Sequence, residues 1–116
     1  MHCIMIMSDQ RRHRRLKKSF PVTLRKRIAV GPDVFLQGNT LDLSQSGAFI
    51  KTESWHLFKP NELTELTLLL PPDFTGRDTP LGLQGSAFVR RVDQLRGGIA
   101  LEFTDELKQF QPIPMC

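Results

Sequence analysis

The sequence predicts an all-β domain, a small six-stranded antiparallel barrel followed by one short C-terminal helix. Six short runs alternate apolar with polar residues, and clusters of Gly, Pro, Asn and Asp separate them. The chain has 116 residues, of which 40% are hydrophobic, which is enough for one modest core. Closing six strands into a barrel also leaves no long apolar edge unprotected.

The pattern divides the chain into three parts. Residues 1–19 lack core-forming periodicity and are predicted to be a flexible basic arm. Residues 20–103 carry the alternating runs and form the barrel. Residues 104–116 form the short helix and a tail, with Thr104 as its cap and Pro112 ending it.

The strands follow in order. Phe20 begins the first, in which alternate positions are apolar as far as Val30, with an interruption at Lys26. A Gly-Pro-Asp turn separates it from the second strand. The later strands are bounded by turn residues or, for the last pair, by a short hairpin connection. They span residues 34–43, 47–53, 63–70, 83–92 and 97–103, and residues 73–82 are expected to be a polar loop.

Positive charge is concentrated in one part of the sequence. Nine basic residues and no acidic residue lie between Arg11 and Arg27, whereas the rest of the chain has seven basic and twelve acidic residues. The net charge of +4 therefore combines a local excess of +9 with −5 elsewhere. This distribution favours an anionic partner of limited size bound by the arm and the strand that follows it.

Catalytic and metal-binding patterns are not found in the sequence. The two cysteines lie at opposite ends of the chain. The three histidines do not have metal-ligand spacing, and none forms a recognisable Ser-His-Asp or Cys-His pattern. We therefore predict a noncatalytic protein without metal or cofactor. No apolar run reaches the roughly 18 residues of a membrane span, and a secretory signal is not apparent, so we expect a cytoplasmic location without membrane insertion.

Two short motifs have simple readings when each is taken alone. Asp42, Ser44 and Gly47 show D-x-S-x-x-G spacing between the second and third strands. This is typical of a turn in which polar side chains bond nearby amides and glycine supplies a positive φ. Arg11 and Arg15 form R-x-x-x-R in the basic arm, which would also suit a solvated tail or a nonspecific RNA contact.

Taken together, in this order and about 27 residues apart, the motifs and the strand pattern resemble the PilZ domain family of bacterial cyclic di-GMP receptors. The resemblance extends from about residue 11 to residue 103 and implies a PilZ-like split barrel with a C-terminal helix. It also implies that the arm folds across the face carrying the second motif, with the ligand between. The implied ligand contacts are Arg11, Arg15, Asp42, Ser44 and Gly47.

The chemistry of these side chains suits that ligand. Arginine can donate paired hydrogen bonds to a phosphate or to guanine O6 and N7, and its flat guanidinium can stack on a purine. An ionised Asp42 accepts from the N–H groups of guanine, and Ser44 can donate or accept. Arg12 is a further candidate contact, whereas Arg14 is expected to face solvent. Ordering of the arm on the ligand would change a surface for a downstream protein partner.

Two other functions compete with this one. A small basic barrel could bind RNA or single-stranded DNA, but such proteins usually offer aromatic stacking platforms, and here the phenylalanines mostly occupy buried positions. A PilZ-like adaptor that binds proteins and no nucleotide is the other alternative.

Trp55 and Phe58 are expected to pack at the barrel mouth, and one of Arg90 and Arg91 to approach the ligand face.

Overall fold

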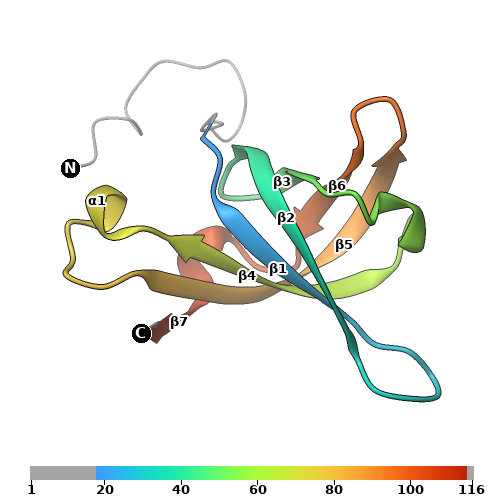
Figure 1. Ribbon diagram of the computed structural model, residues 1–116, viewed down its shortest axis with the longest axis horizontal. Helices are drawn as coiled ribbons and strands as arrows, with labels where there is room; N and C mark the ends of the chain where they lie inside the picture. The colour runs from blue at the N-terminus through green and yellow to red at the C-terminus, as the bar shows by residue number, and fades with distance from the viewer. Residues whose placement is uncertain (1–17, 115–116) are drawn as a thin grey trace.

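Six strands close into an antiparallel barrel, and a seventh is added at its edge (Figure 1). The computed structural model describes residues 18–114. Each pair of neighbouring strands is antiparallel, and β4 pairs with both β1 and β5, which closes the ring. The predicted six-stranded barrel is therefore confirmed. The strands are β1 (Pro21–Lys26), β2 (Val34–Leu43), β3 (Gly47–Lys51), β4 (Leu63–Leu70), β5 (Leu81–Asp93), β6 (Gly98–Phe103) and β7 (Gln111–Pro114).

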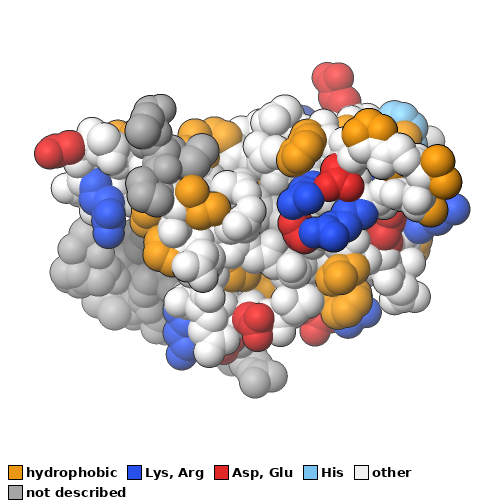
Figure 2. Space-filling view, turned by 90° about the horizontal axis from the view of Figure 1, so that it is seen from below, with side chains coloured by type: hydrophobic (Ala, Val, Ile, Leu, Met, Phe, Trp, Pro, Cys, Tyr) orange, Lys and Arg blue, Asp and Glu red, His pale blue; other side chains and the backbone are white. Residues whose placement is uncertain are grey.

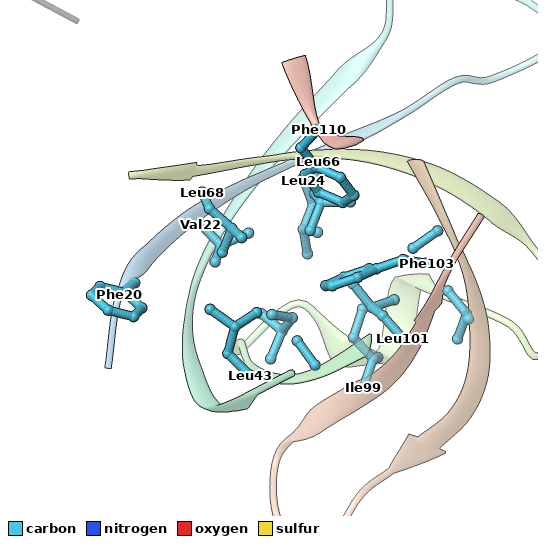
Figure 3. Close-up of a cluster of buried hydrophobic side chains, with 14 of the residues drawn as sticks. Phe20, Val22, Leu24, Leu43, Leu66, Leu68, Ile99, Leu101, Phe103 and Phe110 are labelled. Atoms are coloured by element: carbon cyan, nitrogen blue, oxygen red, sulfur yellow. The ribbon is translucent and has the colours of Figure 1, made fainter. Parts of the chain in front are cut away.

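The period-2 alternation in the sequence places every second side chain of a strand inside the barrel. Figure 3 shows side chains from several strands converging on this interior. The centre of this interior is fully buried, and aliphatic and aromatic side chains fill it at the close packing typical of protein cores. The most deeply buried large side chains include Phe20, Leu24, Ile50, Leu66, Leu68 and Ile99.

The first strand is shorter than its alternation indicates. β1 ends at Lys26, so Ile28 and Val30 lie in the connection to β2 and are 40% and 89% exposed. The pairing of β1 with β4 reaches only Arg25, and beyond it the hairpin projects from the barrel. The expected Gly-Pro-Asp turn is present, and Gly31 has a positive φ of 108°.

The expected terminal helix is largely wrong. Residues 107–109 form a single 3-10 turn, and the side chain of Thr104 caps no helix but donates a hydrogen bond to Ser86 O. Pro112, predicted to end a helix, lies in β7 opposite Leu83 of β5. The chain pairs with β5 instead of continuing as a helix because Phe110 is buried in the core, where its ring centroid lies 4.9 Å from that of Phe103.

Two smaller features complete the barrel. A short helix, α1 (Pro72–Thr75), stands where a polar loop was expected; proline occupies its first turn and Gly76 ends it with a φ of 76°. At the other end of the barrel, Phe58 is buried and Trp55 packs against the core. The expectation that these two aromatic residues pack rather than form an exposed patch is thus confirmed.

Candidate ligand-binding site

The D-x-S-x-x-G segment forms the tight connection between β2 and β3. The Ser44 N–H donates to Gly47 O at 2.9 Å, and Ser44 Oγ accepts from the amides of Ser46 and Gly47, each at 3.3 Å. Ser44 is only 6% exposed. The polar turn expected from the sequence is therefore present, with Ser44 as the side chain that bonds its amides.

Gly47 is required for a different reason from the one predicted. Its φ is not among the positive values, which the glycines Gly31, Gly76 and Gly97 adopt. A Cβ at Gly47 would instead lie 2.3 Å from Leu101 O on β6. Glycine is needed here because β3 and β6 approach closely, and the expected left-handed turn conformation is wrong.

Asp42 lies on the outer side of the barrel because β2 contains a bulge. Thr40 faces the interior opposite Ile50, and the next paired residue is Asp42, opposite Phe49. Leu41 is the extra residue, so that both Leu41 and Asp42 turn away from the core. Bulges commonly re-aim a side chain in this way.

A row of side chains crosses four strands at the level of Asp42. Asp42 of β2 pairs with Phe49 of β3, Phe49 with Ala100 of β6, and Ala100 with Arg91 of β5. A second bulge, between Val89 and Arg91, turns Arg91 outward as the first turns Asp42. Three strand spacings place the ends of the row about 14 Å apart.

Two arginines cover the aromatic residue in this row. Cζ of Arg96 lies 3.9 Å from the Phe49 ring centroid, and Cζ of Arg91 lies 6.0 Å from it. Asp93 holds both from the β5–β6 hairpin: Oδ2 lies 3.6 Å from Arg91 Nη2, and Oδ1 accepts from the Arg96 amide at 3.0 Å. The face beside Asp42 therefore presents two exposed guanidinium groups on a buried aromatic ring.

Sequence reasoning found only part of this arrangement. It suggested that one of Arg90 and Arg91 approaches the ligand face without deciding which. The bulge places Arg91 over Phe49, whereas Arg90 pairs with Glu102 at 2.5 Å. Phe49 and Arg96 were missed. Phe49 follows the period-2 rule for an outward position, and its aromatic character among small outward neighbours, Gly98 and Ala100, was the available signal.

Not all of the positive charge between Arg11 and Arg27 is available to a ligand. Arg25 pairs with Asp33 at 2.6 Å and with Glu65 at 3.2 Å, and Lys26 and Arg27 pair with Glu62 and Glu65. The hydrogen bond from Arg25 to Asp33 raises the pKa of Arg25. Figure 2 shows basic and acidic side chains side by side on the face seen from below. The expected contribution of the strand is thus neutralised locally.

The beginning of the described chain fixes where this arm starts. Thr40 Oγ1 donates to Lys18 O at 2.5 Å, and the Thr40 amide donates to Phe20 O at 2.9 Å. The arm therefore joins the barrel two residues from Asp42 on β2. The predicted contacts Arg11, Arg12 and Arg15 lie outside the described residues, as does Arg14.

The described residues contain neither a group of metal-ligand side chains nor a membrane-spanning helix. Among residues 18–114, no three His, Cys, Asp or Glu side chains are grouped as metal ligands would be. None of the helices in this range is long and apolar enough to cross a membrane.

Comparison with known proteins identifies the family of this fold. The family model for the PilZ domain matches residues 9–111. The chain belongs to the PilZ domain family. PilZ domains are in general noncatalytic receptors for cyclic di-GMP, and this family assignment confirms the resemblance seen in the two motifs.

A solved structure has the same fold. The Bacillus subtilis inhibitor of motility (MotI/DgrA) aligns with a TM-score of 0.63 and 17% sequence identity, over 85% of this PilZ chain and 44% of that chain. The PilZ chain described here thus corresponds to less than half of that protein. A search of curated proteins gave no match.

Proposed function

We propose that this protein binds cyclic di-GMP between its N-terminal arm and the outer face of β2, β3, β6 and β5. The observation that carries the proposal is the place where the arm starts. It joins the barrel at Thr40, two residues from Asp42, so an arm that folds back along β2 would bring both motifs of the family to one face.

The reach of the arm is compatible with this site. Arg15 precedes Lys18 by three residues, about 10 Å of extended backbone, and four more residues separate it from Arg11, about 13 Å. This second distance is close to the 14 Å length of the row from Asp42 to Arg91. The arm and the barrel can therefore contact a ligand of the same length from two sides.

Each proposed contact has a distinct chemical role. Arg11 and Arg15 bind phosphate or stack on guanine, with Arg12 as a further cation, and Asp42 accepts from guanine N–H groups. Ser44 contributes its hydroxyl proton, whose acceptors within the turn, Gly47 O and Ser46 Oγ, both lie at a long 3.3 Å.

The two arginines on Phe49 extend this site across the barrel. Their guanidinium planes already lie over an aromatic ring, and a purine can stack on the outer face of such a plane. Arg91 and Arg96 would thus contact the half of the dinucleotide that lies farthest from Asp42. The ordered arm then becomes part of a new surface for a protein partner.

Nucleic-acid binding has less support from the barrel surface. Among the described residues, Phe35 is the aromatic residue that is largely exposed, at 62%, and it lies seven residues from Asp42 on β2. Stacking platforms for successive bases need several such residues on one face. The described part of the chain does not present them.

Isothermal titration calorimetry on the full chain tests the proposal. We expect binding of cyclic di-GMP but not of GTP or a short RNA, with affinity at least about tenfold lower in Arg15→Ala and Asp42→Ala. Arg96→Ala should also weaken binding. Arg90→Ala is the matched control, since Arg90 is also exposed but pairs with Glu102. Binding of RNA that is unchanged in Asp42→Ala would contradict the proposal.

Hydrogen exchange tests the ordering of the arm separately. Slower amide exchange across residues 8–19 on saturation with cyclic di-GMP is expected, because charge-assisted contacts must hold the backbone against its conformational entropy. Exchange in the β1–β2 hairpin serves as an internal reference and should not change. Equal protection of the arm with and without ligand would contradict arm ordering even if calorimetry shows binding.

A further inference from the structure

One half of β2 has a neighbouring strand on only one side. β1 pairs with β2 over the whole range from Val34 to Asn39, whereas β3 pairs with β2 only from Asn39 onward. After Lys51 the chain leaves the sheet and turns towards the 3-10 helix Trp55–Leu57. Among residues 18–114, no strand pairs with β2 on this side between residues 34 and 38, which leaves an open edge of about 17 Å.

The backbone groups that face this edge can be identified from the register. The Thr40 amide bonds to Phe20 O of the β1 side, so the even-numbered residues of β2 direct their N–H and C=O groups towards β1. The odd-numbered residues direct theirs to the opposite side. This leaves the N–H and C=O of Phe35 and the N–H of Gln37 pointing outward from the open edge.

A side chain at this edge already makes one of the hydrogen bonds that a further strand would make. Thr52 Oγ1 donates to Gln37 O at 2.8 Å, in the position that a backbone amide of a further strand would take. The hydroxyl thus satisfies the acceptor nearest β3, where the two chains diverge. Beyond it, the edge is available for a new ladder.

A groove runs along the open edge. It has a volume of about 540 Å³, with residues 35–39 of β2 as one wall and residues 51–54 as the other. Phe35 stands beside it with 62% of its surface exposed, and the Arg25 guanidinium carbon lies 5.9 Å from its ring. The groove therefore combines backbone donors and an acceptor with an exposed aromatic side chain.

The exposed edge formed by β7 is constructed differently. β7 pairs only with β5, and its sequence is Gln-Pro-Ile-Pro. Proline has no N–H, and natural sheets use it at edges to prevent further pairing. The edge of β2 has no proline or lysine between residues 34 and 38, so it lacks this protection.

We propose that the edge of β2 from residue 34 to residue 38 is a docking site for an extended segment of a partner protein, which adds to the sheet as a β-strand. Main-chain hydrogen bonds to Phe35 and Gln37 hold the segment, and an apolar side chain on it packs against Phe35. Charge plays little part in selection, because Lys51 and Glu53 at the rim have opposite signs. Phe35, the main side-chain contact of the docking site, is seven residues, about 23 Å, from Asp42, and the site does not depend on the ligand proposal.

A generic strand peptide tests the backbone part of this proposal. The probe is acetyl-KTVTVTVTK-amide, and the matched control replaces each threonine of the peptide by proline, which keeps the charge and the valines but prevents pairing. The protein is the full chain without nucleotide. With the probe, NMR amide exchange at Phe35 and Gln37 should slow at least about tenfold, and with the proline peptide it should not change.

Protein variants test the side-chain part. Phe35→Ser should weaken probe binding at least about tenfold, whereas Val30→Ser, at an exposed site on the same hairpin outside the groove, should leave it within about twofold. Unchanged exchange at Phe35 and Gln37 at the solubility limit of the probe would overturn the proposal. So would protection of these amides without peptide, either rising with protein concentration, which would indicate a second copy, or lost on deletion of residues 1–10, which would indicate the chain's own N-terminus.

Discussion

Gly47→Ala is the substitution that best separates the structural role of the D-x-S-x-x-G motif from its role in ligand binding. The added Cβ would lie 2.3 Å from Leu101 O, whereas real Cβ contacts essentially never fall below 3.0 Å. Gly47 lies opposite Glu102 in the ladder between β3 and β6. The two strands must therefore separate locally by at least about 0.7 Å, the difference between these two distances.

The cost of that separation can be placed on a scale. Overpacking in a well-packed region costs about 1–3 kcal/mol. The obstacle at Gly47 is backbone, which cannot rotate away, and each ladder hydrogen bond that is weakened adds about 0.5–1.5 kcal/mol. We expect a loss of about 3 kcal/mol of unfolding free energy, which lowers Tm by about 12 °C for a domain of this size.

Gly76→Ala is the matched control for Gly47→Ala. Gly76 has a φ of 76°, but an added Cβ there meets nothing within 4 Å. Its cost should be limited to the left-handed backbone conformation, about 1–2 kcal/mol. Urea unfolding followed by circular dichroism gives both values, and calorimetry on the folded variants gives their affinity for cyclic di-GMP. If Gly47→Ala lost less than about 0.5 kcal/mol of stability while binding disappeared, the close approach of β3 and β6 would not be the reason for glycine at this position.

Three further predictions concern the barrel. Phe110→Ala should lose about 3–5 kcal/mol in urea unfolding, because a buried aromatic ring is removed, and a loss below about 1 kcal/mol would show that β7 is not held by that ring. Gly85→Ala places a Cβ 2.5 Å from the Phe110 ring, so it should destabilise the wild type but cost measurably less in the Phe110→Ala background; strict additivity in this cycle would contradict the contact. Arg90→Ala should change unfolding free energy by less than about 1 kcal/mol, since its pair with Glu102 is exposed, and a larger change would show a role beyond that ion pair.

Most strands could be predicted from the sequence because the alternation and the turn residues act locally. β2 and β4 match their expected limits, and the turns near them contain Gly31 and Asn61, both with positive φ. The end of β1 could not be predicted in the same way. Val30 continues the alternation, but a strand needs a neighbour as well as a pattern, and β4 provides one only as far as Arg25.

The candidate site was predictable to a different extent. The motif identified Asp42, but its direction depends on a bulge at Leu41 that leaves no simple mark in the sequence. Arg91 and Arg96 come near Asp42 only because β6 and β5 lie two and three strands away from β2 in the closed ring. Residues that meet through register rather than through spacing along the chain cannot be grouped from sequence alone. The reason for glycine at position 47 was missed for the same cause, because the close contact is with Leu101, 54 residues later.

The closed barrel also limits how a bound ligand can act on a partner. Phe49 and Ala100, at the centre of the row, are paired with neighbouring strands on both sides, so a ligand on this face gains little by moving them. Packed cores deform little, and coupling requires an element with two arrangements. The arm, which the sequence predicts to be flexible, and the half of β2 that pairs only with β1 among the described residues are less constrained by such pairing. We therefore expect the ligand signal to appear as a change in surface composition beside Asp42, rather than as a change in barrel shape.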